Sequence, residues 1–458
     1  MTAAVADLIG HDKLHSRTDA APAEMLICGA TALDPRAGID EPLDVLVRGG
    51  MISELGPPGT LAAPAGALAV DAAKLRLLPA FVDPHVHLRS PGQEHKENID
   101  TGTDAAAAGG FCQVIAMPNT SPTVDSVPVL RSLVDSARTQ AHVPTGFLAA
   151  ITVGLAGTDL TEMAALADAG ALGFTDDGKP VTSAGMLRKA LQYQRLAGGV
   201  IALHEEDPTL SADGVMHEGA TSARLGMTGI PSISEAVMVA RDSEIALFED
   251  ARVHFQHLSC VESVIALERF REAGARVSGE ATPHHLTLTD ACVRTLDSRF
   301  KMNPPLRTEA DRKALIEGLR SGVIECIATD HAPHARHEKE VPFEQAPMGT
   351  TGLETAFAAV FTELVVPGVL PLGVVVERMT AGGALYGLPI PRIAVGEPAN
   401  LTLVDTGAAW EVGADGYRSR SQNCCFHGRT LHGRVLLTLA AGRLAFTALP
   451  AGATEVTR

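Results

Sequence analysis

Short apolar segments of the β type alternate with amphipathic segments between about residue 75 and residue 385. Eight segments have the apolar, β-branched composition typical of buried strands, and they span residues 75–87, 111–119, 145–153, 171–177, 199–207, 252–259, 276–285 and 322–334. Between them, residues 127–141, 183–197, 233–251 and 262–274 carry apolar side chains at the i, i+3, i+4 spacing that predicts helices. Repeated strand–helix pairs predict an α/β fold, and eight such pairs predict a (β/α)8 TIM-type barrel.

The two ends of the chain show a different pattern. Residues 25–76 and 389–458 contain short alternating runs, such as MLICGATAL and GRVLLTLAAG, which Gly and Pro interrupt and which predict β strands. We expect these two parts to pair and to form a small β-sandwich beside a barrel that spans residues 77–388. Residues 1–24 show no sustained period, and we expect them to form a flexible N-terminal arm.

Polar, titratable side chains follow almost every one of the eight predicted strands. These strand-end residues are His85, His87, Asn119, Asp176, Asp177, His204, His257, His284, His285 and Asp330. Barrel enzymes build their active sites at the carboxyl ends of the strands, where the loops meet. The pattern therefore predicts an active site at that end of the barrel.

Two histidines in the first of these strands suggest a metal site. His85 and His87 lie two residues apart, so both side chains point to the same face of the strand. His204, His257 and Asp330 each follow another apolar run. Together these residues supply four imidazoles and a carboxylate, a set of ligands that suits zinc.

Neighbouring residues compete for two of these places. His254 competes with His257, although an odd separation puts the two on opposite faces of a regular strand. Asp176 competes with Asp177, and the sequence DDGKP is equally compatible with an ordinary turn. Pattern alone leaves both choices open.

Charge and composition narrow the class of protein. The 458 residues include 37 Lys and Arg against 54 Asp and Glu, a formal net charge of −17. Such an acidic chain has no basic stripe for nucleic acid or for an anionic membrane surface. Its apolar runs are too short for a membrane span, and its start has no signal-peptide pattern. Seven scattered cysteines do not suggest a disulfide framework, so we expect reduced thiols and a cytoplasmic location.

Longer motifs resemble one known family. Residues 79–111, PAFVDPHVHLRSPGQEHKENIDTGTDAAAAGGF, resemble the opening of the dihydroorotases, specifically the longer class found in many bacteria. The motifs AMPNTSPTVDS, FTDDGKPV, HEED, TPHHLTLTD, KMNPPLR, ATDHAPH and FHGRTLHGRV continue the resemblance in order. It covers essentially everything from Met25 to about Phe446. Dihydroorotases are amidohydrolases of de novo pyrimidine (UMP) synthesis, and the resemblance implies reversible cyclisation of N-carbamoyl-L-aspartate to (S)-dihydroorotate plus water.

The resemblance also implies a cofactor, two Zn²⁺ ions per chain. His85, His87 and Asp330 would bind one ion, His204 and His257 the other, and Asp177 would bridge the two together with a hydroxide. Asp330 would be the catalytic residue, acting as general base and then as general acid. Substrate binding would fall to the residues that match the family pattern, which are His87, Arg89, Asn119, Asn303, His334, Met348 and Gly349.

Two other functions remain as alternatives. An allantoinase or a hydantoinase would use a carbamylated lysine as the bridge, whereas here Lys179 lies two residues beyond the Asp pair. A non-catalytic dihydroorotase-like chain that scaffolds aspartate carbamoyltransferase would typically lack metal ligands, and this chain retains all six. Association with that transferase and a homodimer stay open. Residues 208–232 and 334–352 form long connections at the predicted catalytic face, and we expect at least one to order on binding.

Overall fold

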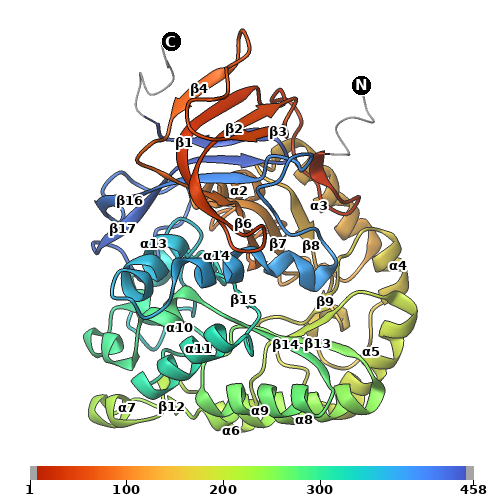
Figure 1. Cartoon of the computed structure of the whole chain (residues 1–458). Coiled ribbons are helices and arrows are strands. Elements are labelled where there is room, and N and C mark those ends of the chain that lie inside the picture. The colour runs from red at the N-terminus through yellow and green to blue at the C-terminus, as the bar shows by residue number, and fades with distance from the viewer. Residues whose placement is uncertain (1–7, 450–458) are drawn as a thin grey trace.

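The structure, a computed structural model, describes residues 8–449. Figure 1 shows its two parts. A layer of strands at the top is built from the N-terminal and C-terminal parts of the chain, and below it lies a strand-and-helix body formed by the middle of the chain. No helix in residues 8–449 is long and apolar enough to cross a membrane.

Eight parallel strands form the body. They are β6 (Phe81–Val86), β7 (Phe111–Ala116), β8 (Thr145–Phe147), β9 (Phe174–Thr175), β10 (Ile201–Leu203), β13 (Arg252–Phe255), β14 (Arg276–Ala281) and β15 (Cys326–Ile327). Ladder pairing runs from β6 through β8 and from β9 through β15. Two parallel bridges, Ala149 with Phe174 and Val86 with His331, join these two groups at both edges. The hydrogen-bonded strands therefore return to β6 and close a ring.

Each ring strand is followed by a helix. In order, the helices are α2 (Ile99–Ala108), α3 (Val127–Gln140), α4 (Met163–Asp168), α5 (Ala184–Ala197), α8 (Ile233–Glu249), α9 (Val261–Glu272), α11 (Glu309–Ser321) and α14 (Leu372–Thr380). The helices predicted from the i, i+3, i+4 spacing are confirmed as α3, α5, α8 and α9, with boundaries that shift by at most two residues at each end. The mixed α/β class is confirmed as well.

Local sequence explains why these elements form where they do. β6 and β7 are buried along their whole length, so neither shows the alternation of buried and exposed residues that is typical of a half-buried strand. Helix starts have side-chain caps: Asn98 caps α2 and Thr308 caps α11, each in a reciprocal capping box. Buried faces of the helices and strands then merge into one large apolar cluster.

Shorter elements fill the connections between the ring strands and the helices that follow them. They are α6 (Pro208–Ser211), β11 (Met216–His217), α7 (Ala220–Leu225), β12 (Gly229–Ile230), α10 (Pro283–Thr287), α12 (Arg336–Lys339) and α13 (Ala356–Val360). The first four lie in the long connection 208–232, and α12 lies in the connection 334–352. Whether either connection orders on binding stays a prediction.

Strands from both chain ends share one mixed sheet. The N-terminal part supplies β1 (Met25–Asp34), β2 (Ile39–Arg48), β3 (Met51–Gly56), β4 (Leu68–Asp71) and β5 (Arg76–Pro79), and the C-terminal part supplies β16 (Leu401–Glu411), β17 (Thr430–Ala440) and β18 (Arg443–Thr447). Antiparallel pairing of β5 with β16 joins the two parts, with Leu77 opposite Leu403. The predicted pairing of the two ends is therefore present.

The described part of the N-terminal arm, residues 8–24, lies against the body. Leu14 is buried with Leu148 and Leu172, and the backbone of His15 pairs with Thr145. Residues 1–7 of the expected arm and residues 450–458 of the C-terminal part lie outside the described residues.

Leu77 tests whether the shared sheet contributes to stability. Its side chain is fully buried in the cluster that also contains Leu401 and Leu437. We expect Leu77→Ala to leave a cavity and to cost about 2–5 kcal/mol of unfolding free energy. The midpoint of urea denaturation measures this cost. Leu444→Ala, the same change at a residue that is 39% exposed, is the matched control; equal midpoints for the two variants would contradict a packed junction between the chain ends.

Candidate active site

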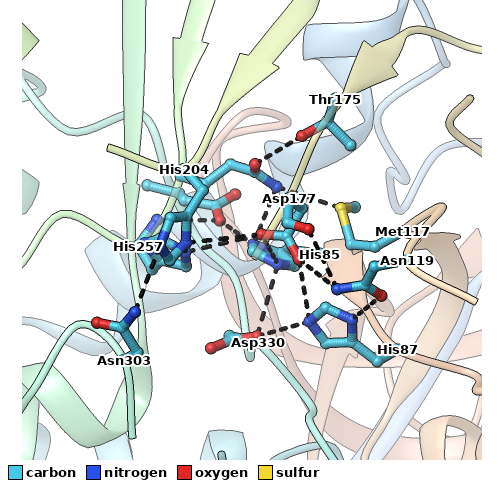
Figure 2. A network of polar contacts seen from close by, with 12 residues as sticks. His85, His87, Met117, Asn119, Thr175, Asp177, His204, His257, Asn303 and Asp330 are labelled. Carbon is cyan, nitrogen blue, oxygen red and sulfur yellow. Dashed lines mark hydrogen bonds and ion pairs between the residues drawn. The ribbon is translucent and has the colours of Figure 1, made fainter. Parts of the chain in front are cut away.

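Six side chains from five ring strands meet at the carboxyl end of the ring. His85 lies in β6 and His87 directly follows it, whereas Asp177, His204, His257 and Asp330 lie one to three residues beyond β9, β10, β13 and β15. All six side chains, which the sequence pattern and the family resemblance suggested, are buried and are together in one group (Figure 2).

Asp177 lies at the centre of this group. Its Oδ1 is 3.3 Å from Nε2 of His85, 3.8 Å from Nε2 of His257 and 4.0 Å from Nδ1 of His204. Its Oδ2 is 3.5 Å from Nε2 of His87. One carboxylate thus faces four imidazoles from three different strands, which is the placement expected of a bridging ligand.

Asp330 lies beside the first two histidines. Its Oδ1 is 3.0 Å from Nε2 of His87 and 3.5 Å from Nε2 of His85. On the other side of the group, Nδ1 of His204 is 2.8 Å from Nε2 of His257. Asp330 therefore lies with His85 and His87, and His204 lies with His257, while Asp177 contacts all four imidazoles.

Charge and burial work against each other in this group. Burial by itself would raise the pKa of Asp177, but the imidazoles, His85 foremost, outweigh it and hold that pKa well below the ordinary range. Burial also opposes a charge on His85, yet Asp177 and Glu280 raise its pKa well above the ordinary value. The carboxylates and the imidazoles of the group thus stabilise each other's charged forms, so the carboxylates attract positive charge.

The backbone at the site is strained. Within residues 8–449, eight non-glycine residues have a positive φ, and three of them are Arg89 (57°), His257 (33°) and Asp330 (47°). Such conformations are unfavourable for residues with a side chain, and they persist where the surrounding structure enforces them. Three of the eight lie at this site, which indicates that the fold fixes the directions of these side chains by holding the backbone in an unfavourable conformation.

The structure resolves both choices that the sequence left open. Asp176 turns away from the group and accepts hydrogen bonds from the backbone N–H groups of Ile151 and Thr152. Nε2 of His254 is hydrogen-bonded to Glu280 rather than to any residue of the group. Lys179, the alternative to Asp177 as a bridge, is exposed.

Two further buried histidines, His284 and His285, pack in α10 and are not part of the group. His285, in α10, is hydrogen-bonded to Thr282 and to the carbonyl of Pro304, and burial lowers its pKa to about 4. Burial likewise holds the pKa of His284 well below its ordinary value. Both are neutral packing residues.

A cavity of about 230 Å³ opens onto the group. It is lined by His87, Arg89, Asn119, Asp177, Gly178, His204, His257, Asn303, Asp330, Ala332, His334, Met348 and Gly349. All seven residues expected to bind substrate line this cavity. The arrangement therefore gives one small molecule simultaneous access to the buried group and to the expected binding residues.

Three of these lining residues have informative partners. Asn119 accepts a hydrogen bond from Nδ1 of His87 (2.9 Å) and donates one to Oδ2 of Asp177 (3.1 Å), so it also orients the histidine. Arg89 donates through Nε to the carbonyl of Pro333, at 3.2 Å, which leaves its terminal N–H groups for the cavity. Asn303 donates to Oε2 of Glu206 at 2.6 Å.

Sequence reasoning missed Glu280, in β14. Its Oε1 accepts a hydrogen bond from Nδ1 of His85 at 2.7 Å and from the backbone of His257, and its Oε2 is 3.0 Å from Nε2 of His254. Glu280 therefore fixes the ring of His85 with Nε2 toward Asp177 and Asp330, a carboxylate–histidine arrangement typical of metal sites. Glu280 does not stand at a strand end, so the strand-end pattern gave no signal for it.

The donor set fits a divalent cation. Within residues 8–449, His85 with Asp177 and His257, and His85 with His87 and Asp330, bring their ligand atoms within 4.8 Å of one another. Nε2 of His85 is buried and has no hydrogen-bond partner among the described residues, although it faces two carboxylates. Imidazole nitrogens and carboxylate oxygens in this number are the ligands that zinc prefers.

Two solved structures of known proteins share this fold. A dihydropyrimidinase of Brevibacillus agri (TM-score 0.79, 23% identical) covers 93% of this chain and 95% of its own. An L-hydantoinase of Arthrobacter aurescens (TM-score 0.82, 23% identical) covers 92% and 96%. At these identities, the likeness concerns the fold.

Sequence comparison identifies the family. A family model described as Dihydro-orotase-like matches residues 74–263. The dihydroorotase of Pelotomaculum thermopropionicum is 44% identical over 92% of this chain and 98% of its own length, and that of a Geobacter species (strain M21) is 42% identical over 93% and 99%. The chain belongs to the dihydroorotase family.

Glu280→Gln tests how the site is held together. The change keeps the size of the side chain but removes the negative charge that makes His85 a stronger ligand, so we expect metal affinity to fall by about tenfold to 100-fold. Metal retained after dialysis against a graded chelator, measured by elemental analysis, reports this loss directly. Glu317→Gln, on the exposed face of α11, should retain metal as the wild type does. Equal retention in both variants would exclude a supporting role for Glu280.

Proposed function

We propose that this chain is a zinc-dependent dihydroorotase that interconverts N-carbamoyl-L-aspartate and (S)-dihydroorotate plus water. The placement of Asp177 among four imidazoles, with Asp330 beside His87, is the observation that carries the proposal. Close sequence relatives that bear the dihydroorotase name support the choice of reaction. The scaffold in this proposal is a (β/α)8 barrel, residues 77–388, beside a β-sandwich built from residues 25–76 and the described part of the C-terminal segment, residues 389–449.

His85, His87 and Asp330 would hold one zinc ion, His204 and His257 the second, and Asp177 would lie between them. When bound, the metal pair supplies Lewis acidity toward a carbonyl oxygen and lowers the pKa of a water molecule. Two divalent ions against two carboxylates leave the site positive, which favours an anionic substrate even though the whole chain is acidic.

Asp330 is the residue we assign to proton transfer. Its Oδ1 contacts His87, and Figure 2 shows its second oxygen without a contact to the other residues drawn. In the hydrolytic direction, Oδ2 would take a proton from the attacking water and deliver it to the ring nitrogen as the amide bond breaks. In the direction of ring closure, the same oxygen would remove the proton from that nitrogen.

Arg89 and its neighbours would bind and orient the substrate. Its guanidinium offers a planar fork that matches the substrate carboxylate, and Arg89 lines the cavity. His334 is neutral, because burial lowers its pKa to about 2, and its Nε2 donates to the carbonyl of Met348. His334 therefore lines the cavity without adding charge to it.

Asp177 also bears on the choice among cyclic-amide hydrolases. A lysine bridge of the allantoinase and hydantoinase kind would need Lys179 in the group, and Lys179 is exposed instead. The chain has every expected metal ligand, whereas a non-catalytic dihydroorotase-like chain would typically lack some of them. A homodimer and assembly with aspartate carbamoyltransferase stay predictions.

Metal removal tests the proposed chemistry. We expect the purified protein to contain about two zinc ions per chain, to lose dihydroorotate hydrolysis when they are chelated and to regain it with added Zn²⁺.

Asp330→Asn should keep the fold and lose turnover by at least about 100-fold. Elemental analysis, circular dichroism and an absorbance assay of dihydroorotate measure these three effects. Asp415→Asn, at an exposed carboxylate, should be fully active, and full activity of Asp330→Asn would disprove the assigned proton transfer.

Arg89→Met tests recognition of the substrate carboxylate. Loss of a buried charged pair should lower kcat/KM for dihydroorotate by about 100-fold. Dihydrouracil, the same ring without the carboxylate, provides the internal comparison, because its inhibition constant against dihydroorotate hydrolysis should change little. Arg336→Met, at an exposed arginine, serves as the control variant. A parallel loss of affinity for dihydrouracil would mean that Arg89 does not bind the carboxylate.

A further inference from the structure

One wall of the active-site cavity is formed by residues other than the six of the metal group. Two segments form it, residues 332–334 after β15 and residues 347–349 at the end of the following connection. The two segments approach so closely that a Cβ on Gly349 would lie 2.8 Å from Cβ of Ala332, and φ of Gly349 is +134°. Glycine is therefore required there, and something must hold the two segments at this separation.

Asn423 connects the two segments. Its Oδ1 accepts a hydrogen bond from the backbone N–H of His334 at 3.0 Å, and its Nδ2 donates to the carbonyls of Ala332 (3.0 Å) and Gly349 (3.1 Å). All three partners line the active-site cavity, whereas Asn423 does not. Its side chain is buried, at 4% exposed, so the three bonds do not compete with bulk water.

Lys339 holds the second segment from the other side. Its ammonium donates to the carbonyls of Pro347 (2.8 Å), Gly349 (2.9 Å) and Lys301 (3.3 Å), so its three N–H groups meet three acceptors. The carbonyl of Gly349 thus receives hydrogen bonds from both Lys339 and Asn423. The two side chains act on one shared atom of the cavity wall.

The segment that carries Asn423, residues 418–425, is anchored on the catalytic face. The backbone N–H groups of Arg418 and Ser419 donate to Glu354, and the side chain of Ser421 donates to the carbonyl of Lys96 at 2.6 Å. Ser419 and Arg420 also donate to the buried carboxylate of Glu97. Asn423 is therefore presented by a fixed support that lies between β16 and β17 in the sequence.

We propose that Asn423 is a positioning residue for the substrate: by joining residues 332–334 to Gly349, it sets the separation of the two segments that line the cavity. The inference rests on the proposed substrate-binding role of His334, Met348 and Gly349. Asn423 touches neither the substrate nor the metal ligands, so its loss acts on binding and leaves the chemistry in place. Such a loss raises KM while kcat is retained.

Asn423→Ala tests this role in the intact, metal-loaded enzyme. Loss of three buried hydrogen bonds should raise KM for dihydroorotate by about tenfold, whereas kcat should stay within about twofold of the wild type. Metal content and the thermal unfolding midpoint are measured on the same samples. Gln422→Ala is the matched control, because it removes an amide from the adjacent, exposed residue and should leave KM unchanged.

A second variant uses the shared carbonyl. Lys339→Met should also raise KM, and because both side chains bond to Gly349, the effect of the double variant on KM should be smaller than the product of the single effects. If Asn423→Ala does not fold, Asn423→Ser replaces it in the same assays, with the same expected rise in KM.

Three results would overturn the proposal: an unchanged KM in a folded Asn423 variant, an equal rise in KM for Gln422→Ala, or a fall in kcat accompanied by loss of metal. Wild-type enzyme without zinc or without dihydroorotate turnover would instead refute the proposed function. Wild-type activity together with a normal KM in the Asn423 variant would refute the positioning role alone.

Discussion

A buried carboxylate surrounded by imidazoles is the interaction on which the active site depends. Asp177 is only 3% exposed, and burial of a charge is unfavourable unless opposite charge lies close by. His85, His87, His204 and His257 supply nitrogens at 3.3 to 4.0 Å from its oxygens. Because these residues come from strands far apart in the sequence, only the closed ring of parallel strands brings them together. Fold and chemistry are therefore inseparable here.

Much of this site could be predicted because of how parallel strands end. Strands that run in one direction bring their carboxyl ends to the same edge, so histidines and aspartates at successive strand ends had to be neighbours. The choice between Asp176 and Asp177 needed the structure, because neighbouring residues differ in direction and β9 has only two residues to define its faces. His254 and His257 posed the same problem, and the irregular backbone at His257 decided it.

Residues that support the site were harder to predict for a different reason. Glu280 bonds to His85 across 195 positions, and Asn423 bonds to Ala332 across 91. Neither residue is part of a local pattern: Glu280 looks like one more polar residue in a short strand, and Asn423 lies in a polar segment that resembles a surface loop. Only three-dimensional contacts distinguish such residues from solvent-exposed ones. Motif similarity indicates that the C-terminal region matters, but it does not say what the region contacts.

Pairing of β5 with β16 has a consequence for how the chain is made. Leu77 and Leu78 are opposite Leu403 and Thr402, so more than 300 residues must leave the ribosome before that edge of β5 finds its partner. During this interval the apolar edge of the first sheet is exposed to other chains, a situation that favours aggregation of nascent proteins. Completion of the sheet is thus a late event in biosynthesis, and chaperone binding to the early β layer would shield it until the C-terminal strands arrive.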